Sequence, residues 1–357
     1  MRRILAIALV AACSGSPAPA PSAPPPPRAA ASDSNIARAD YVGPETCGEC
    51  HAEQYGKWSH SLHRVMNARA TPNAVIGDFA GAVVAYGGGT ATFTRDRDGF
   101  AMTLARGGAS VRYRVTRTIG RRGLQEYVGI ADGAREEVRL PFGWWPRRGG
   151  WFPQPYYDPW LGDEAGFDAY AEVTAPWAER CPWCHSTYPF AQRIARAAGP
   201  RGLGHGLEQR FVGEAPPDPE RLDTAQQITV GISCESCHLG GRAHVAGGAI
   251  TFVPRGAPTR DGAPAMPAAF ADERRDADVV DAVCAQCHSG PSPRLADGTA
   301  LRNSSEAIDL AASPCRGIRC TDCHDPHRAD ARSDEARAIA ACTGCHAALA
   351  DAATARA

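Results

Sequence analysis

Cysteine and histidine recur along this chain in one fixed pattern, Cys-x-x-Cys-His. Two thiols three residues apart, followed at once by an imidazole, are the attachment signature of a c-type haem. The thiols bind the porphyrin covalently and the histidine takes one axial position on the iron. The pattern occurs six times and therefore predicts six covalently bound haems c, each with its own proximal histidine. The cysteines are Cys47, Cys50, Cys181, Cys184, Cys234, Cys237, Cys284, Cys287, Cys320, Cys323, Cys342 and Cys345, and the histidines are His51, His185, His238, His288, His324 and His346.

Zinc is the alternative metal, since zinc sites also use Cys-x-x-Cys pairs. A structural zinc needs four ligands, usually from two such pairs, and zinc gives no reason for a histidine directly after every pair. The repeated adjacency favours haem. It also accounts for twelve of the fourteen cysteines, and only Cys13 and Cys315 remain.

The N-terminus has the features of an export signal that ends at Cys13. Two arginines precede an apolar stretch, Ile4 to Ala12, that is too short to span a bilayer. The run from Leu9 to Ser14 resembles a bacterial lipobox with Cys13 as the lipidated residue. Cleavage further along, leaving a soluble periplasmic protein, is the alternative. We expect a protein that is lipid-anchored in the bacterial cell envelope, facing the periplasm or on the outer membrane.

A haem iron has a second axial position, and histidine is again the first candidate for it. The chain has eleven histidines, and those outside the motifs are His60, His63, His205, His244 and His327. Five imidazoles cannot fill six positions, so at least one iron has another distal ligand. The options are Met66, Met102, Met266, Lys57, Cys315 and water.

Some of these options have a simpler explanation. Met102 is expected in the core of a strand and Lys57 on a solvated helix face. Cys315 is expected to be a buried thiol, with a thiolate ligand as the alternative. Water would leave an open coordination position for substrate chemistry.

Distance along the chain shows which haem a distal histidine does not serve. His327 lies three residues after His324, and three residues reach at most about 10 Å, too little to pass round the rim of a haem. His63 lies twelve residues past His51, which is about 18 Å along a helix axis. We expect both residues to bind neighbouring haems.

The sequence divides into five segments. Residues 1–13 are the signal and lipobox, and the Pro- and Ala-rich residues 14–40 are an extended tether. Residues 41–75 hold the first haem motif, and a helix is expected over residues 52–70. Residues 76–160 form a β-insert with an aromatic loop, and residues 161–357 hold the other five motifs. We expect a mainly α and irregular multihaem cytochrome c fold, with short helices around the haem motifs and a small antiparallel β-insert.

Alternating apolar residues mark the β-insert between Gly87 and Leu140. Runs such as Phe100, Met102 and Leu104, separated by glycine-containing turns, indicate four or five antiparallel strands. The following aromatic loop should cover a haem edge or the open face of the strands, and a partner-docking surface is the alternative. Its tryptophans are Trp144, Trp145, Trp151 and Trp160.

Charge gives little information about partners. The net charge is −1, and 37 of the 38 basic residues are arginine. The arginine fork suits haem propionates, although a GC-rich genome produces the same bias. No basic cluster with interleaved aromatics is present, so we expect no nucleic-acid partner.

Several stretches resemble multihaem c-type cytochromes of the superfamily that contains hydroxylamine oxidoreductase and its tetrahaem acceptor cytochrome. They are Trp58-x-x-Ser61-x-His63, Gly231 to His238 followed by Gly-Gly-x-x-His244, and Cys323 to His327. The stretches Thr118 to Gly120 and Leu124 to Tyr127 are similar to a subgroup with a β-insert after the first haem. The resemblance covers roughly residues 41 to 328. It implies that His63, His244 and His327 are distal ligands of neighbouring haems, and that haems stack in close pairs.

Together these features predict a hexahaem lipoprotein that transfers electrons between periplasmic or outer-membrane redox proteins, or to a membrane respiratory complex. The alternative is an oxidoreductase that acts on a small nitrogen or sulfur compound at an under-ligated haem. A third hypothesis is a docking subunit whose β-insert binds a larger respiratory complex. No catalytic residue is assigned, and electron transfer is favoured over catalysis.

Overall fold

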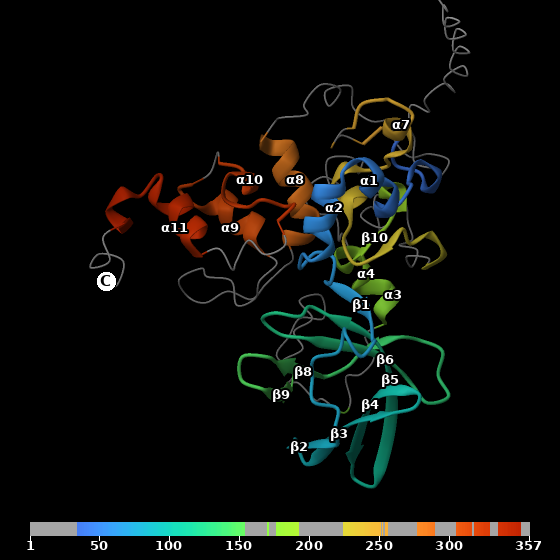
Figure 1. Ribbon diagram of the computed structural model, residues 1–357. Coiled ribbons are helices and arrows are strands. Elements are labelled where there is room, and N and C mark those ends of the chain that lie inside the picture. The colour runs from blue at the N-terminus through green and yellow to red at the C-terminus, as the bar shows by residue number, and fades with distance from the viewer. Residues whose placement is uncertain are drawn as a thin grey trace, which may run out of the picture. The chain divides into compact units, whose positions relative to one another are not determined.

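The computed structural model describes residues 34–153, 170, 176–192, 224–250, 252, 254–255, 277–289, 305–315, 318–328 and 335–350. The helices are η1 (Arg38–Asp40), α1 (Pro44–Cys50), α2 (Ala52–Ser59), α3 (Trp177–Arg180), α4 (Pro182–His185), η3 (Thr224–Gln226), α6 (Cys234–His238), α7 (Arg242–Val245), α8 (Ala277–His288), α9 (Glu306–Ala312), α10 (Cys320–Cys323), α11 (Glu335–Thr343) and η5 (Ala347–Ala350). The strands are β1 (Asn67–Arg69), β2 (Ala82–Tyr86), β3 (Gly89–Asp96), β4 (Gly99–Arg106), β5 (Ala109–Ile119), β6 (Glu126–Ala131), β7 (Val138–Arg139), β8 (Phe142–Trp145), β9 (Gly150–Pro153), β10 (Ser186–Thr187) and β11 (Thr229–Val230) (Figure 1). Among the described helices, none has both the length and the apolar character needed to span a membrane.

The haem motifs lie on short helices, as predicted. Helices α1, α4, α6 and α10 are built largely from the motif itself, and α8 and α11 reach theirs at the C-terminal end. Proline occupies the first turn of α1 and α4, at Pro44 and Pro182, where its missing N–H is no loss because first-turn N–H groups have no partner within a helix. Helices this short are not stable alone. Their stability must come from what packs against the motifs.

The β-insert is larger than the sequence indicated. An antiparallel meander runs in the order β2-β3-β4-β5-β6-β7, and β1 pairs with the far end of β5, from Asn67↔Ile119 to Arg69↔Arg117. This is a seven-stranded sheet, so the prediction of a mainly α fold is not confirmed.

Glycine makes the tight turns of this sheet possible. A two-residue loop connects β4 to β5, and its residues Gly107 (φ 59°) and Gly108 (φ 83°) are both left-handed. That conformation is what a two-residue hairpin needs and what glycine adopts at low cost.

One face of the sheet forms an apolar core, as the alternation predicted. Phe93, Phe100 and Met102 are buried there. The β8–β9 hairpin closes over this core, because Trp151 lies flat on Phe93 with ring centroids 3.6 Å apart and planes at 7°. The aromatic loop therefore covers the open face of the strands, which is one of the roles expected of it. Trp160 lies outside the described residues.

The prediction of a helix over residues 52–70 is wrong in its second half. Helix α2 ends at Ser59 with His60 at its C-cap, and the chain then becomes extended and pairs as β1. Tertiary contacts decide this. Asn67 is fully buried, and its Nδ2 donates a hydrogen bond to Ser186 Oγ (2.8 Å), an arrangement that a continued helix would break.

Packing already begins inside the segment predicted as a tether. Ile36 is fully buried against Phe190 and Leu239, and its carbonyl accepts the N–H of Ala191 (3.0 Å). Residues 34–40 therefore belong to the folded part of the chain. The other segment boundaries stay predictions.

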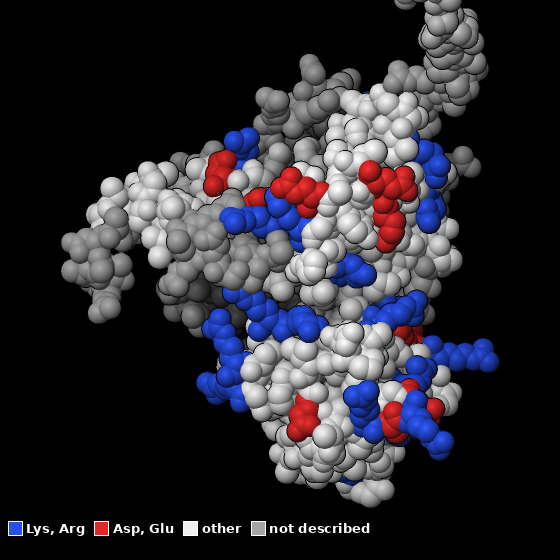
Figure 2. All heavy atoms as spheres, in the orientation of Figure 1, with Lys and Arg blue, Asp and Glu red and all other residues white. Residues whose placement is uncertain are grey.

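Positive charge is concentrated on the β-insert. Residues 67–153 contain thirteen arginines and seven Asp or Glu, a net charge of +6, so the other residues carry −7 of the total of −1. Figure 2 shows Lys and Arg side chains spread over the surface of the strands. The haem-binding part of the chain is the acidic part, even before propionates are counted.

Candidate haem-binding sites

The structure brings three predicted distal histidines to the proximal histidine of another motif. The ring centroids are 6.1 Å apart for His51 and His244, 6.1 Å for His238 and His327, and 6.4 Å for His63 and His288. In every pair, the distal residue follows a different motif from the one that supplies its partner. The ring planes are nearly parallel in the first two pairs, at 18° and 12°, and nearly perpendicular in the third, at 76°.

These distances fit an iron held between the two rings. Metal–imidazole bonds are about 2.0–2.1 Å long, so rings bound to opposite sides of one metal have centroids about 6 to 6.5 Å apart once half of each ring is added. All three pairs fall in this range. The thiols that would hold the porphyrin are not joined in disulfides.

Burial favours the neutral imidazole, which is the form that binds a metal. Burial, reinforced by His327, His51 and His244, lowers the pKa of His238 to about 4. Burial likewise lowers the pKa of His63. The influence of three other imidazoles on His238 also shows that two of the pairs lie close together.

Hydrogen bonds orient the outer nitrogen of two rings. Nδ1 of His244 lies 3.0 Å from the carbonyl oxygen of Gly248, and Nδ1 of His288 lies 3.0 Å from Glu306 Oε2. The bond to Glu306 raises the pKa of His288 against the opposing effect of burial. An Nδ1–H donated in this way fixes the tautomer and leaves Nε2 for a metal.

Comparison with known proteins gives one family match and two structural similarities. The family model described as a doubled CXXCH motif matches residues 313–351. No curated protein matches the chain. The outer cell wall cytochrome OcwA is 19% identical, covering 75% of this chain and 44% of that chain, with a TM-score of 0.35. The undecahaem cytochrome from the S-layer of Carboxydothermus ferrireducens is 18% identical, covering 87% and 43%, with a TM-score of 0.40.

The chain spans less than half the length of either cytochrome, and TM-scores this low do not establish a shared fold. The doubled motif is a sequence feature of its own, and it covers the fifth and sixth copies of the attachment pattern. The doubled motif, in a chain that holds six copies of the attachment pattern, supports a multihaem c-type cytochrome with covalently bound haem c. The narrower resemblance to the hydroxylamine oxidoreductase superfamily stays a prediction.

Neighbouring motifs of the chain lie close to one another. The neighbouring side chain of Cys234 raises the pKa of the Cys47 thiol. The neighbouring Cys284 likewise raises the pKa of the Cys320 thiol. These contacts join the first motif to the third and the fourth to the fifth.

Further contacts link the remaining motifs. The hydroxyls of Thr187 and Ser236 lie 2.8 Å apart, next to the second and third motifs. Cys184 Sγ lies 3.9 Å from the carbonyl oxygen of Gln286, between the second and fourth. Burial and then the neighbouring Cys342 raise the pKa of Cys323, which places the sixth motif beside the fifth. These contacts thus join the first motif to the third, the third to the second, the second to the fourth, the fourth to the fifth and the fifth to the sixth.

Glu235 holds the first and third motifs together, a role that the sequence did not indicate. Its side chain is buried, and its carboxylate accepts backbone N–H groups from Val42 (3.0 Å), Gly43 (2.8 Å) and Gly241 (2.9 Å). These donors come from the segment before the first motif and from the one after the third. No local pattern distinguishes this residue from Glu49, an exposed glutamate inside the first motif.

The second motif lies against the β-insert. The ring of His185 is 6.1 Å from that of the buried Trp177 in α3, at 52°. Burial lowers the pKa of His185, and the charges of Glu126 in β6 and Arg139 in β7 also act on it. No other described histidine lies opposite this ring.

The last two proximal histidines, His324 and His346, are exposed, and no imidazole faces them within the described ranges. His60 is not brought to a motif either. Its Nδ1 lies 2.9 Å from the carbonyl oxygen of Gly56, within its own helix turn. His205 lies outside the described residues.

The other candidate distal ligands lie in different surroundings. Met102 is fully buried in the strand core and Lys57 pairs with Glu53 on the helix surface (2.6 Å), both as expected. Met66 packs near Trp177 in the second motif's surroundings. The prediction of a buried thiol at Cys315 is wrong: the residue is exposed in the turn after α9. Met266 lies outside the described residues.

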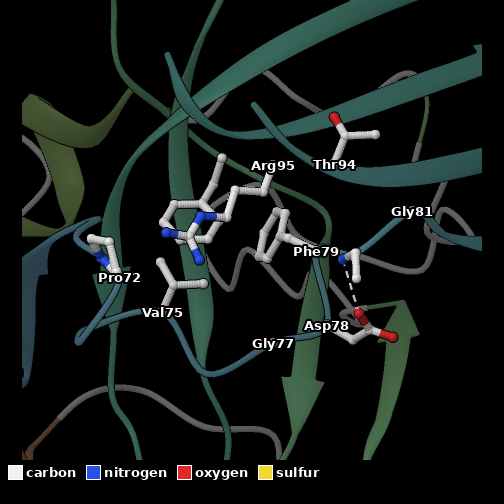
Figure 3. A pocket seen from close by; sticks show the side chains of 10 residues that line it. Pro72, Val75, Gly77, Asp78, Phe79, Gly81, Thr94 and Arg95 are labelled. Atoms are coloured by element: carbon white, nitrogen blue, oxygen red, sulfur yellow. Dashed lines mark hydrogen bonds between the residues drawn. The ribbon is translucent and has the colours of Figure 1, made fainter. Parts of the chain in front are cut away.

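A pocket in the β-insert is unrelated to the motifs. It has a volume of about 590 Å³ and is open to one side (Figure 3). Val75 and Phe79 form its apolar wall, Arg95 lies over the Phe100 ring (5.3 Å), and Asp78 accepts the N–H of Ala80 (2.9 Å). Its lining contains neither cysteine nor histidine.

Proposed function

We propose that this cytochrome carries six haems c and passes electrons along them between redox partners in the cell envelope. A haem supplies one-electron chemistry by cycling its iron between the ferric and ferrous states. The single observation that carries the proposal is the exchange of ligands between motifs. A histidine that follows one motif faces the proximal histidine of another in three pairs, so the haems are held as close neighbours.

The sequence motifs and the three imidazole pairs support the residue assignments. The twelve motif cysteines attach the porphyrins, and the six motif histidines are proximal ligands. His244, His327 and His63 are the distal ligands opposite His51, His238 and His288. His60 and His205 are the imidazoles left for the haems of His185, His324 and His346.

The continuous series of motif contacts supports electron transfer as the function. Each motif lies within hydrogen-bond or charge-interaction distance of the next. Such a series would hold the six haems in one cluster, in which electrons pass between neighbours. The protein sets each potential through ligand, burial and nearby charge.

The partners we propose are other redox proteins or a membrane respiratory complex, with a lipid on Cys13 as the membrane anchor and no nucleic acid. A Cys13→Ser variant should move from the membrane to the soluble fraction. A variant that stays membrane-bound would remove the lipid anchor from the proposal.

A second candidate function rests on the ligand deficit. Three proximal histidines face no imidazole in the described residues, and only His60 and His205 remain for them. At least one haem then has an open position or a different ligand. An open position is the condition for acting on a small nitrogen or sulfur compound.

Rapid mixing separates the two functions. The fully reduced protein is mixed without oxygen either with a small oxidised cytochrome of higher potential or with nitrite or hydroxylamine. We expect the small cytochrome to reoxidise all haems, while both nitrogen compounds leave them reduced. Reoxidation of the haems by nitrite or hydroxylamine, repeated when a chemical reductant is supplied in excess, would instead establish the enzyme.

A further inference from the structure

Arg117 of β5 is a buried arginine at the end of the β-insert nearest the second haem motif. Its side chain is 9% exposed, and its Nε donates to both carboxylate oxygens of Glu137 (3.0 and 2.9 Å). Glu137 is the more exposed member of this pair. The pair brings a positive group into a site from which water is largely excluded.

The Arg117 guanidinium has an N–H group that is free to donate another hydrogen bond. Its Nη1 is buried and has no hydrogen-bond partner among the described residues. A buried N–H of a charged group that is left unpaired destabilises the fold, so an unpaired guanidinium N–H calls for an explanation. Glu137 already accepts the hydrogen bond from Nε. A second carboxylate could accept hydrogen bonds from the terminal nitrogens of the guanidinium.

Trp177 connects this guanidinium to the second motif. The guanidinium carbon of Arg117 lies 5.4 Å from the centroid of the Trp177 ring, and that ring lies 6.1 Å from the ring of His185. The same apolar cluster contains Ile119, Val128 and Trp177, with Cys181 of the motif packed against it. The β-insert and the second haem site are therefore in contact.

Other orphaned polar atoms lie in the same region. Nδ1 of His185 and Oδ1 of Asn67 are buried without a partner, and Asn67 contacts Ser186, the residue after His185. A haem brings two carboxylates on flexible arms to its site. It is the one group already expected here that offers acceptors for a buried guanidinium.

We propose that Arg117 binds a propionate of the haem attached to Cys181 and Cys184, so that the β-insert forms part of this haem's site and sets its reduction potential. The inference rests on the proposed six-haem function. A buried positive charge favours the reduced haem, because reduction adds one negative charge to the site. Arg117 raises the potential of this haem above the value it would have without the β-insert, and Glu137 partly offsets the effect.

The test is a potentiometric titration of full-length holoprotein variants, after intact mass has shown that each carries the same haems as the wild type. Arg117→Gln should move one redox component to lower potential and leave the others in place. The matched control is Arg114→Gln, which removes the same charge from an exposed position on the same strand and should move none. Arg117→Lys keeps the charge, so the reduction potential of this component should lie close to its wild-type value.

Two results would overturn the inference. One is an Arg117→Gln titration that matches Arg114→Gln, and the other is an equal shift of all components. If the Arg117→Gln protein does not fold or accumulate, the Glu137→Gln variant tests the proposal instead. That variant removes the offsetting charge and should move the same component upward, and an unchanged titration would contradict the proposal. A wild-type protein without haem on Cys181 and Cys184 would instead contradict the six-haem function itself.

Discussion

The β-insert and the proposed haem-binding region of this protein are stabilised in different ways. The β-insert has one continuous apolar core, with Phe93, Met102 and Tyr127 fully buried and long antiparallel ladders around it. The haem-binding region has short helices and small apolar clusters, and its segments are joined by polar contacts such as those of Glu235. The β-insert has the means to fold alone, whereas the haem-binding region needs its haems as core.

Removal of the haems should give the largest difference between the two regions. In a chain produced without haem attachment, we expect amides of β3 to β6 to keep the protection of a folded domain, about 5–15 kcal/mol. Amides of α1, α6 and α8 should exchange almost freely, because helices of this length are not stable alone. Hydrogen exchange read by mass spectrometry measures both. Protected motif helices in the haem-free chain would contradict the comparison.

A cavity in the β-insert core should affect that region alone. Phe93→Ala removes the ring that Trp151 stacks on and should cost about 3–5 kcal/mol of unfolding free energy. The haem absorbance spectrum should not change. Val83→Ala, on the exposed side of β2, is the control and should stay within about 0.5 kcal/mol. Loss of haem from the Phe93 variant would show that the regions fold as one.

Loss of the Glu235 carboxylate should destabilise the haem-binding region. Glu235→Ala leaves three backbone N–H groups without their acceptor and should cost about 3 kcal/mol. Denaturant unfolding followed at the haem band measures it. Glu49→Ala removes an exposed glutamate from the first motif and should have almost no effect. Equal stability of the two variants would show that the buried carboxylate does not hold the motifs together.

A distal ligand should matter to one haem only. His327→Ala removes the imidazole that faces His238, so one haem should change from low to high spin while the protein stays folded. Electron paramagnetic resonance of the oxidised protein detects the change. Lys57→Ala, which removes a side chain paired with Glu53 on the helix surface, should leave the spectrum as it is. An unaltered spectrum for the His327 variant would show that His327 does not bind a haem iron.

The sequence predicted the parts of the site that depend on local pattern. Covalent haem attachment requires Cys-x-x-Cys-His, so the six motifs could be found in the sequence. Because the chain between His324 and His327 is short, His327 was predicted to bind the haem of another motif. Alternation and paired glycines likewise predicted a sheet with tight hairpins. These features depend on neighbours in the chain.

What the sequence could not predict depends on contacts between distant segments. The partner of each distal histidine comes from another motif, so spacing along the chain gave no pairing. The early end of α2 follows from the burial of Asn67, and the roles of Glu235 and Arg117 follow from segments that meet only in the fold. Local propensity for a helix over residues 52–70 was overridden by strand pairing.

The intact mass of the exported protein tests the central claim most directly. Every motif should hold one haem through two thioether bonds, so the mass should equal that of the processed chain plus six haems and the lipid on Cys13, and this should persist under denaturing conditions. A protein with fewer than six covalent haems would contradict the account of six linked sites. So would one that loses its metal on denaturation, as a zinc protein would.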